Sequence, residues 1–214
     1  MTKKLCVLTF DMVGSKKVRE RGKLQEAVIS ALATLNRKYR SSLRAGFKMT
    51  LGDEFQAAFL RCSDAYAAFK EVRAKIAVGV YCGMGFGEVS TDLSRDPSRM
   101  DGPAFHMSRL AVMRAKKQKA SLIIDVGDES KNALLNAFAS LIIHTTGNWT
   151  GRQTEIIGYL EARPDLTQQE VAKHFGISPP AVTKALKTAG WRRVADAEKV
   201  LTELMEDEIR VVKT

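Results

Sequence analysis

The stretch that decides the fold is FKMTLGDEFQAAF, residues Phe47–Phe59. Apolar residues alternate with others on both sides of Gly52-Asp53, which predicts two short strands joined by a tight turn. An aspartate at such a turn lies at the edge of a sheet, and the apolar run Leu5–Phe10 leads into a second aspartate, Asp11. Magnesium prefers one or two carboxylates together with substrate phosphates. We therefore predict that Asp11 and Asp53 bind Mg²⁺.

The residues that follow Asp11 suggest a phosphate site. Gly14 and Ser15 are expected to open a basic helix that runs from about Lys16 to Ser42, and a helix N-terminus offers free N–H groups and a positive dipole end to phosphate. Alternation from Asp53 sends Glu54 to the opposite face, so Glu54 is not predicted as a ligand. In the alternative interpretation each aspartate only caps a turn, as aspartate often does.

Composition limits the class of protein. The 214 residues suffice for one sizeable domain and a small one, and no apolar stretch reaches the roughly 18 residues that span a membrane. Three cysteines without metal-ligand spacing indicate reduced thiols and a cytoplasmic protein. The net charge of +10 arises in residues 1–147, which hold 24 basic and 14 acidic residues. This excess suits a polyanionic partner, although a basic solvated surface explains it equally well.

The predicted order of elements indicates an α+β fold. The stripe Leu24, Val28, Leu32, Leu35 and Tyr39 places one face of the first helix in the core. Four glycines in the stretch 76–89 suggest bulges or the close approach of another backbone. Further helices are expected at 63–74, with Ser63 as N-cap, at 102–117 and at 129–143, and a last strand at 121–125. The order β-α-β-β-α-β, followed by α-β, is the ferredoxin-like plan.

Polar residues 144–148 predict a domain boundary, with domains at 1–145 and 146–214. Thr150 and Thr167 each begin a capping box in the second domain. Gly176 permits a turn between two helices, Pro179 suits a first helical position, and Gly190 ends the second helix. Together these positions predict an all-α helix-turn-helix domain.

The exposed side of the second helix of this motif is predicted to contact DNA. Basic residues there suit DNA phosphates, and Thr183 and Lys184 suit base edges. The predicted DNA-contacting residues are Ser178, Pro179, Pro180, Thr183, Lys184, Lys187, Arg192 and Arg193. The alternative is a helix-turn-helix used only for protein contact or dimerisation.

Five motifs carry a family resemblance over essentially the whole chain: DMVGS at 11–15, RGKLQ at 21–25, LGDEFQ at 51–56, GMGFG at 83–87 and DGPAFH at 101–106. They resemble the SatD family. At a greater distance, the N-terminal domain is similar to class III nucleotidyl cyclases and GGDEF domains. That similarity implies metal binding by Asp11 and Asp53, triphosphate binding by the backbone of Met12, Val13, Gly14 and Ser15, and an Arg109 directed towards the phosphates.

The chain departs from the cyclase pattern at two positions. Phe105 stands where cyclases place the asparagine that stabilises the transition state, and Met49 stands where they place a purine-selecting lysine. The resemblance therefore implies metal and nucleotide binding more directly than cyclisation.

These observations lead to one main functional hypothesis and two alternatives. The main hypothesis is a DNA-binding transcriptional regulator, a weakly held homodimer, whose cyclase-like domain binds a magnesium–purine nucleotide complex. The first alternative is an enzyme that makes a cyclic or oligomeric nucleotide by attack of a 3′-hydroxyl on an α-phosphate. The second is a plain DNA-binding module in which the aspartates are structural.

Overall fold

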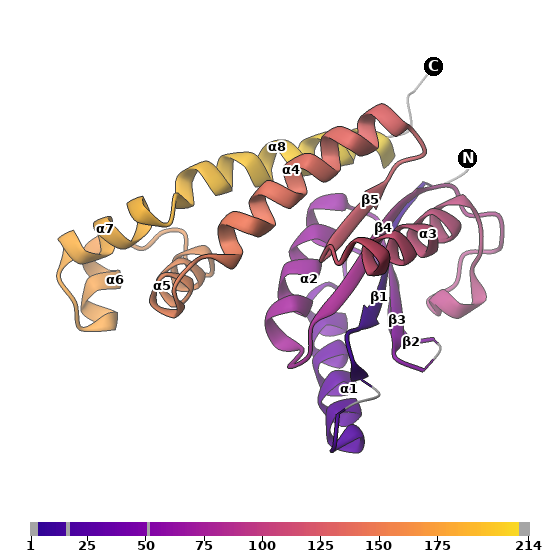
Figure 1. The fold of residues 1–214 in the computed structure, drawn as a ribbon, viewed down its shortest axis with the longest axis horizontal. Coiled ribbons are helices and arrows are strands. Elements are labelled where there is room, and N and C mark those ends of the chain that lie inside the picture. Colours follow the sequence, from indigo (N-terminus) through magenta and orange to yellow (C-terminus); the bar gives the residue numbers. More distant parts are fainter. Residues whose placement is uncertain (1–3, 16–17, 51, 210–214) are drawn as a thin grey trace. The chain divides into compact units, whose positions relative to one another are not determined.

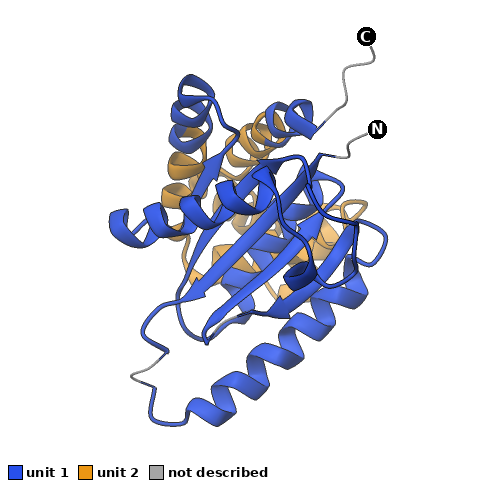
Figure 2. Cartoon of the chain, turned by 90° about the vertical axis from the view of Figure 1, so that its right-hand side faces the viewer, with its two compact units in different colours: residues 1–137, 202–214 blue, residues 138–201 orange. Residues whose placement is uncertain are grey.

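The computed structural model describes residues 4–15, 18–50 and 52–209. Residue contacts divide the chain into two compact units (Figure 2). Unit 1 comprises the residues up to 137 together with those from 202 onward, and unit 2 comprises residues 138–201. The division into contact units does not test the domain boundary predicted between residues 145 and 146, which stays a prediction.

Unit 1 is a mixed α/β fold built on five strands: β1 (Leu5–Met12), β2 (Leu43–Met49), β3 (Glu54–Phe59), β4 (Val80–Gly87) and β5 (Leu122–Asp125). They form one sheet in the order β2-β3-β1-β4-β5 (Figure 1). Neighbouring strands are antiparallel except β4 and β5, which are parallel. The order of strands and helices along the chain is the one predicted from the sequence.

One face of the sheet is covered by α1 (Arg21–Lys38) and α2 (Cys62–Lys75) (Figure 1). The predicted stripe of α1 is confirmed, because Val28, Leu32 and Leu35 are buried. Aromatic rings fill the layer beneath the two helices. Phe10 of β1 stacks on Phe55 of β3 with ring centroids 4.8 Å apart, a geometry that stabilises beyond the area buried.

The other face is covered by α3 (Pro103–Gln118), which lies directly on the backbone of β4 (Figure 1). A Cβ added at Gly83 would lie 2.2 Å from the carbonyl oxygen of Ser108, and one added at Gly85 would lie 2.2 Å from the Ser108 nitrogen. Only glycine allows this contact, so the predicted close approach of another backbone is confirmed.

The close approach creates a buried polar network. The Ser108 hydroxyl lies 2.6 Å from the Thr9 hydroxyl and 3.0 Å from the Gly83 carbonyl. The Gln56 side-chain amide donates to the Thr9 hydroxyl at 2.8 Å. Since buried polar groups are stable only when they are paired, this network fixes α3 along β1 and β4.

Two long helices, α4 (Glu129–Gly147) and α8 (Trp191–Ile209), each have residues in both units. The last turns of α8 belong to unit 1, where the Cys62 thiol donates to the Met205 carbonyl at 3.2 Å. The Glu206 carboxylate accepts the backbone N–H of Ser63 at 3.2 Å, which satisfies a free donor in the first turn of α2. A short 3₁₀ helix, η2 (Pro97–Arg99), precedes α3.

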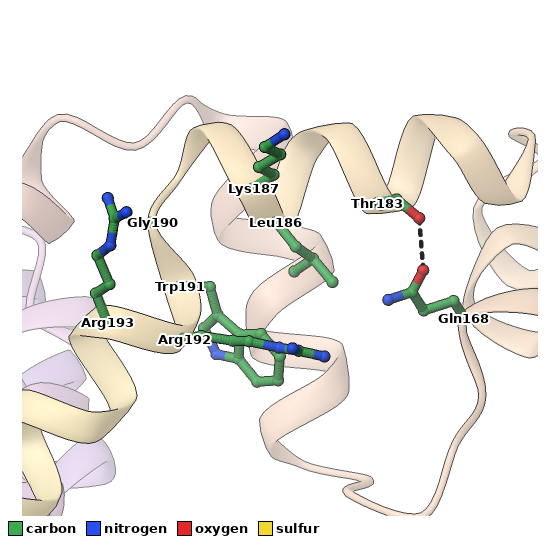
Figure 3. A pocket seen from close by; sticks show the side chains of 8 residues that line it. All are labelled: Gln168, Thr183, Leu186, Lys187, Gly190, Trp191, Arg192 and Arg193. Carbon is green, nitrogen blue, oxygen red and sulfur yellow. Dashed lines mark hydrogen bonds between the residues drawn. The ribbon is translucent and has the colours of Figure 1, made fainter.

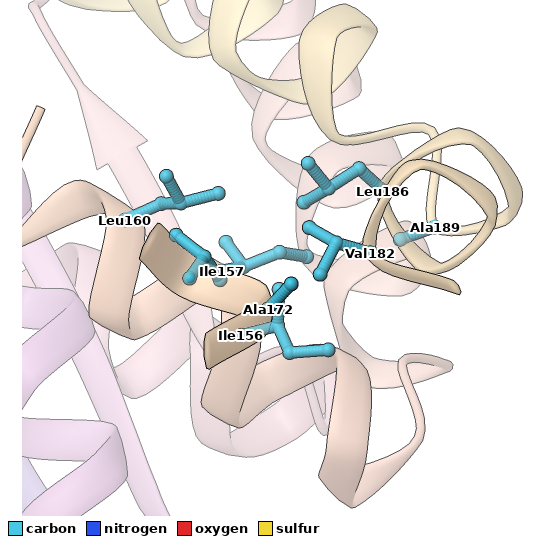
Figure 4. Close-up of a cluster of buried hydrophobic side chains, with 8 residues drawn as sticks. Ile156, Ile157, Leu160, Ala172, Val182, Leu186 and Ala189 are labelled. Carbon is cyan, nitrogen blue, oxygen red and sulfur yellow. The ribbon is translucent and has the colours of Figure 1, made fainter. Parts of the chain in front are cut away.

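Unit 2 contains α5 (Gly151–Glu161), α6 (Gln168–Phe175) and α7 (Pro179–Thr188). Their apolar faces form one buried cluster: Ile156, Ile157, Leu160, Val171, Ala172, Val182, Leu186 and Ala189 (Figure 4). Both capping boxes predicted from the sequence are confirmed, at Thr150 with Gln153 and at Thr167 with Glu170.

The ends of α6 and α7 also follow the local sequence signals. Gly176 ends α6 with φ of +63°, and Gly190 follows α7 with φ of +64°. Both values lie in the left-handed region that glycine adopts without strain. Within the described residues, no helix combines the length and the apolar character that crossing a membrane requires.

Several predicted helix ends are wrong. Helix α1 begins at Arg21 rather than Lys16, so Gly14 and Ser15 do not open it, and it ends at Lys38 rather than Ser42. Ser63 is not the N-cap of α2. The helix begins at Cys62 with Arg61 as its N-cap, so Ser63 is its second residue. Ser178 is the N-cap of α7, but its side chain makes no capping hydrogen bond. Lys16, Lys17 and Leu51 lie outside the described residues.

Replacing Gly85 by alanine tests the contact between α3 and β4. The new Cβ would overlap the Ser108 backbone, and overpacking of this kind costs about 1–3 kcal/mol or more. We expect Gly85→Ala to lower the free energy of unfolding by at least that amount in urea titrations followed by circular dichroism.

Gly158→Ala is the matched control, because a Cβ there meets no atom within 4 Å. In the middle of α5 it should stabilise the chain by about 0.5–1 kcal/mol. Equal effects of the two variants would contradict the packing described for α3.

Candidate functional site

Two carboxylates lie side by side where β1 and β3 meet. Asp11 is the register partner of Glu54 in the antiparallel pair. Directly opposite residues in such a pair point to the same face of the sheet, so Glu54 shares the face of Asp11. The expectation that Glu54 points away from the site is wrong, because Asp53 belongs to the turn and strand alternation does not begin until Glu54. Asp11, Asp53 and Glu54 are called the carboxylate edge below.

Asp53 is tied to the loop that follows β1. The Met12 N–H donates to the Asp53 carbonyl at 3.3 Å. The Ser15 hydroxyl, which is buried, donates to the Asp53 carboxylate at 2.5 Å. The turn between β2 and β3 and the loop after β1 are therefore held together, which brings Asp11 and Asp53 to the same end of the sheet.

Lys116 of α3 completes this end of the sheet. Its Nζ lies 2.7 Å from the Asp11 carboxylate. The hydrogen bond to Asp11 raises the pKa of Lys116, and attraction by Asp11, Glu54 and Asp53 adds to the effect. Lys116 is not among the site residues predicted from the sequence. It stands two helical turns after Arg109, and this spacing is a signal that the two side chains share a face of α3.

The pKa of Glu54 depends on burial and on neighbouring charges of both signs. Partial burial raises the pKa of Glu54, repulsion by Asp11 and Asp53 raises it further, and Lys116 and Arg109 act in the opposite direction. Arg109, which is exposed, therefore lies close enough to the carboxylate edge to act on its charge.

The backbone amides after Asp11 differ in their availability. The Met12 N–H is bonded to Asp53, and the Val13 N–H donates to the Gly79 carbonyl at 2.7 Å. Among the described residues, the N–H groups of Gly14 and Ser15 have no acceptor. Gly14 is exposed and has φ of +65°. Two adjacent free amides in a turn form an anion-binding concavity.

The residues of the carboxylate edge fit a magnesium ion only in part. Within the ranges that the structure describes, no three His, Cys, Asp or Glu side chains are arranged to bind a metal ion. Asp11 and Asp53 nevertheless supply two carboxylates at one end of the sheet, and magnesium is commonly bound by one or two carboxylates, water and substrate phosphates. The donor set therefore suits magnesium that arrives with a phosphate ligand.

The two positions that depart from the cyclase pattern lie in different surroundings. Phe105 is fully buried in a cluster with Leu5 and Val7, near the opposite end of β1 from Asp11. Met49 is half-buried at the end of β2, where it pairs with Phe55.

All eight residues predicted to contact DNA are exposed on unit 2. On α7 they alternate with the buried Val182 and Leu186, as expected for an amphipathic helix. Thr183, Lys187, Arg192 and Arg193 border a pocket of about 450 Å³ (Figure 3).

Comparison with known proteins identifies the family. The model of the SatD family matches residues 5–205, and the chain belongs to this family. A search of curated proteins finds no match.

Solved structures similar to this chain include cyclase and GGDEF domains. A bacterial light-regulated adenylyl cyclase is 14 % identical over 59 % of this chain and 44 % of its own, with a TM-score of 0.44. The GGDEF domain of YfiN (TpbB) from Pseudomonas aeruginosa is 18 % identical over 57 % of this chain and 82 % of its own, with a TM-score of 0.36. A microbial GGDEF domain studied with bis-(3′,5′)-cyclic di-GMP is 17 % identical, with 57 % and 78 % covered and a TM-score of 0.42. Similarity at this level does not assign an activity to the chain.

The raised pKa of Glu54 predicts a pH dependence of stability. A carboxyl group whose pKa is higher in the folded state stabilises the protein below its unfolded pKa of about 4.3 and loses this contribution as the pH rises through the folded pKa. Glu54→Gln removes the cost of a partly buried charge that Asp11 and Asp53 repel, so it should raise the melting temperature at pH 7 and have less effect at pH 4.

Melting temperatures measured from pH 4 to pH 8 check this result. Glu26→Gln, at an exposed position of α1, is the control and should show the same difference from wild type at every pH. A difference for Glu54→Gln that is constant across the range would contradict the environment described for Glu54.

Proposed function

We propose that unit 1 binds a purine nucleoside triphosphate together with Mg²⁺ at the carboxylate edge. The observation that supports this most strongly is the Ser15–Asp53 hydrogen bond, which holds the second carboxylate beside the loop that follows Asp11. Asp11 and Asp53 would hold the magnesium ion, which would offset the negative charge of the phosphates.

The remaining groups have separate roles in this proposal. The amides of Gly14 and Ser15 would donate to phosphate oxygens. Lys116 now pairs with Asp11 at 2.7 Å, and it would exchange this partner for phosphate when magnesium binds Asp11. Arg109, two turns before Lys116 on the same face of α3, would bind a terminal phosphate, since guanidinium groups pair with phosphate in bidentate fashion.

Thermal unfolding with nucleoside triphosphates, with and without magnesium, tests this proposal. A ligand that binds only the folded state at 100 times its Kd stabilises by about 2.7 kcal/mol. For a chain of this length we expect a rise in Tm of roughly 5–10 °C that requires both nucleotide and magnesium. Asp53→Asn should abolish the rise.

Asp92→Asn is the matched control. Asp92 is exposed in the loop after β4, at the other end of the sheet from Asp11, and its replacement should leave the rise intact. No shift with any nucleotide, or an equal loss in both variants, would overturn the proposal.

The same preparation tests the enzymatic alternative. Conversion of the bound triphosphate to a cyclic or oligomeric product, lost in Asp11→Asn, would extend the proposed function from binding to catalysis. Phe105 is buried away from Asp11 and offers no polar group to a transition state, so any turnover would depend on other residues of the site.

A second candidate function is DNA binding by unit 2, acting as a helix-turn-helix domain of a transcriptional regulator. The observation that favours it is the arrangement of α6 and α7, in which Val182 and Leu186 are buried while the polar and basic side of α7 is exposed. A single helix-turn-helix usually reads a two-fold operator, which suits a homodimer. Nucleotide binding would control DNA affinity only if the two conformational states differ in nucleotide affinity.

The salt dependence of DNA affinity tests this candidate. Each phosphate contact contributes about 0.9 to the slope of log K against log salt concentration. Lys184→Gln removes one exposed cation of α7 and should reduce the slope by about that amount in fluorescence anisotropy titrations. Lys117→Gln removes an equal charge from α3 and should leave the slope unchanged. Equal slopes for wild type and Lys184→Gln would exclude this use of α7.

A further inference from the structure

The pocket of about 450 Å³ in unit 2 has features that DNA contact does not explain (Figure 3). It lies between α6, α7 and the start of α8, and its size falls within the range of small-molecule sites. Leu186 and Trp191 give it an apolar wall, and the basic side chains of Lys187, Arg192 and Arg193 also line it.

Several polar groups of the pocket have no partner among the residues that the structure describes. Neither Arg192 nor Arg193 forms an ion pair with any residue that the structure describes. The Gln168 side-chain oxygen accepts the Thr183 hydroxyl at 2.6 Å, and this bond leaves the amide NH₂ group without an acceptor among the described residues. Figure 3 shows this nitrogen on the side that faces Trp191.

Trp191 adds an unsatisfied donor that is buried. Its indole N–H is buried and has no acceptor within the described part of the chain. A buried donor without a partner is unfavourable, and natural structures contain few of them.

Together these groups define the chemistry of a ligand. A planar ring can stack on the tryptophan and leucine wall. The Gln168 amide can donate to an acceptor on the edge of that ring, and guanidinium groups bind phosphate. A nucleotide combines a planar ring, acceptors on its edge and a phosphate.

We propose that unit 2 carries its own binding site for a nucleoside monophosphate in this pocket. The site is separate from the carboxylate edge of unit 1 and goes beyond the functions proposed above. No lining residue is acidic, so binding here does not require magnesium. Thr183 and Lys187 line the pocket and also belong to the predicted DNA-contacting surface, so an occupied pocket would compete with DNA.

Calorimetric titration of the full chain with AMP, GMP, CMP and UMP in EDTA tests the proposal. We expect saturable binding of at least one of them. Arg192→Gln should weaken it about tenfold or more, as expected for the loss of a charge-assisted hydrogen bond. Lys173→Gln, which removes a charge from an exposed position of α6 outside the pocket, should leave it unchanged.

Asp53→Asn separates this site from the one in unit 1, because it should leave binding in EDTA intact. Circular dichroism of each variant confirms that it is folded. The proposal is overturned by the absence of saturable binding, by equal losses in Arg192→Gln and Lys173→Gln, or by loss in Asp53→Asn alone. Inorganic phosphate binding as tightly as every nucleotide would also overturn it, since the pocket would then be a simple anion site.

Discussion

The contact of α3 with the backbone of β4 is the constraint on which unit 1 depends. Gly83 and Gly85 have no side chains, so the helix lies against the strand at Ser108. At this distance the Ser108 hydroxyl reaches both Thr9 and Gly83, and the buried network fixes the helix along its own axis. Lys116 then lies above Asp11, two turns farther along. A bulkier residue in β4 would move α3 away from the strand and separate Lys116 from Asp11, because the packing of α3 on β4 determines where Lys116 lies.

The electrostatics of the carboxylate edge follow from this packing. Three carboxylates from two strands and a turn lie near one another, and like charges that lie close together are costly unless cations or metal ions offset them. Lys116 and Arg109 act against this repulsion, while burial first and then repulsion by Asp11 and Asp53 raise the pKa of Glu54. Such an arrangement favours the binding of a further cation. A magnesium ion bound to a triphosphate would supply that cation, and the phosphate groups would pair with Lys116 and Arg109 of α3. The proposed function of unit 1 rests on this balance and on the amides of Gly14 and Ser15, which have no acceptor among the described residues.

Unit 2 is stabilised differently, because short-range signals determine most of its structure. Two capping boxes and two left-handed glycines place the ends of its helices, and an apolar stripe on each helix forms the common cluster around Val182 and Leu186. These signals lie within a few residues of the positions they control. The outer side of α7 remains exposed, and the side chains of Gln168, Trp191 and Arg192 beside it carry donors that have no acceptor among the described residues.

The sequence by itself determined the order of the elements, the two capping boxes of unit 2 and the positions of Asp11 at the end of one strand and Asp53 in a turn, because alternation, capping and turn chemistry act over short distances. It did not determine where α1 begins, since the segment between Ser15 and Arg21 carries no capping signal strong enough to fix a start. Only the tertiary structure placed Glu54 beside Asp11, brought Lys116 to the site and attached the last turns of α8 to α2. These contacts join residues far apart in the chain, and they depend on strand register and helix packing, which local sequence patterns do not specify.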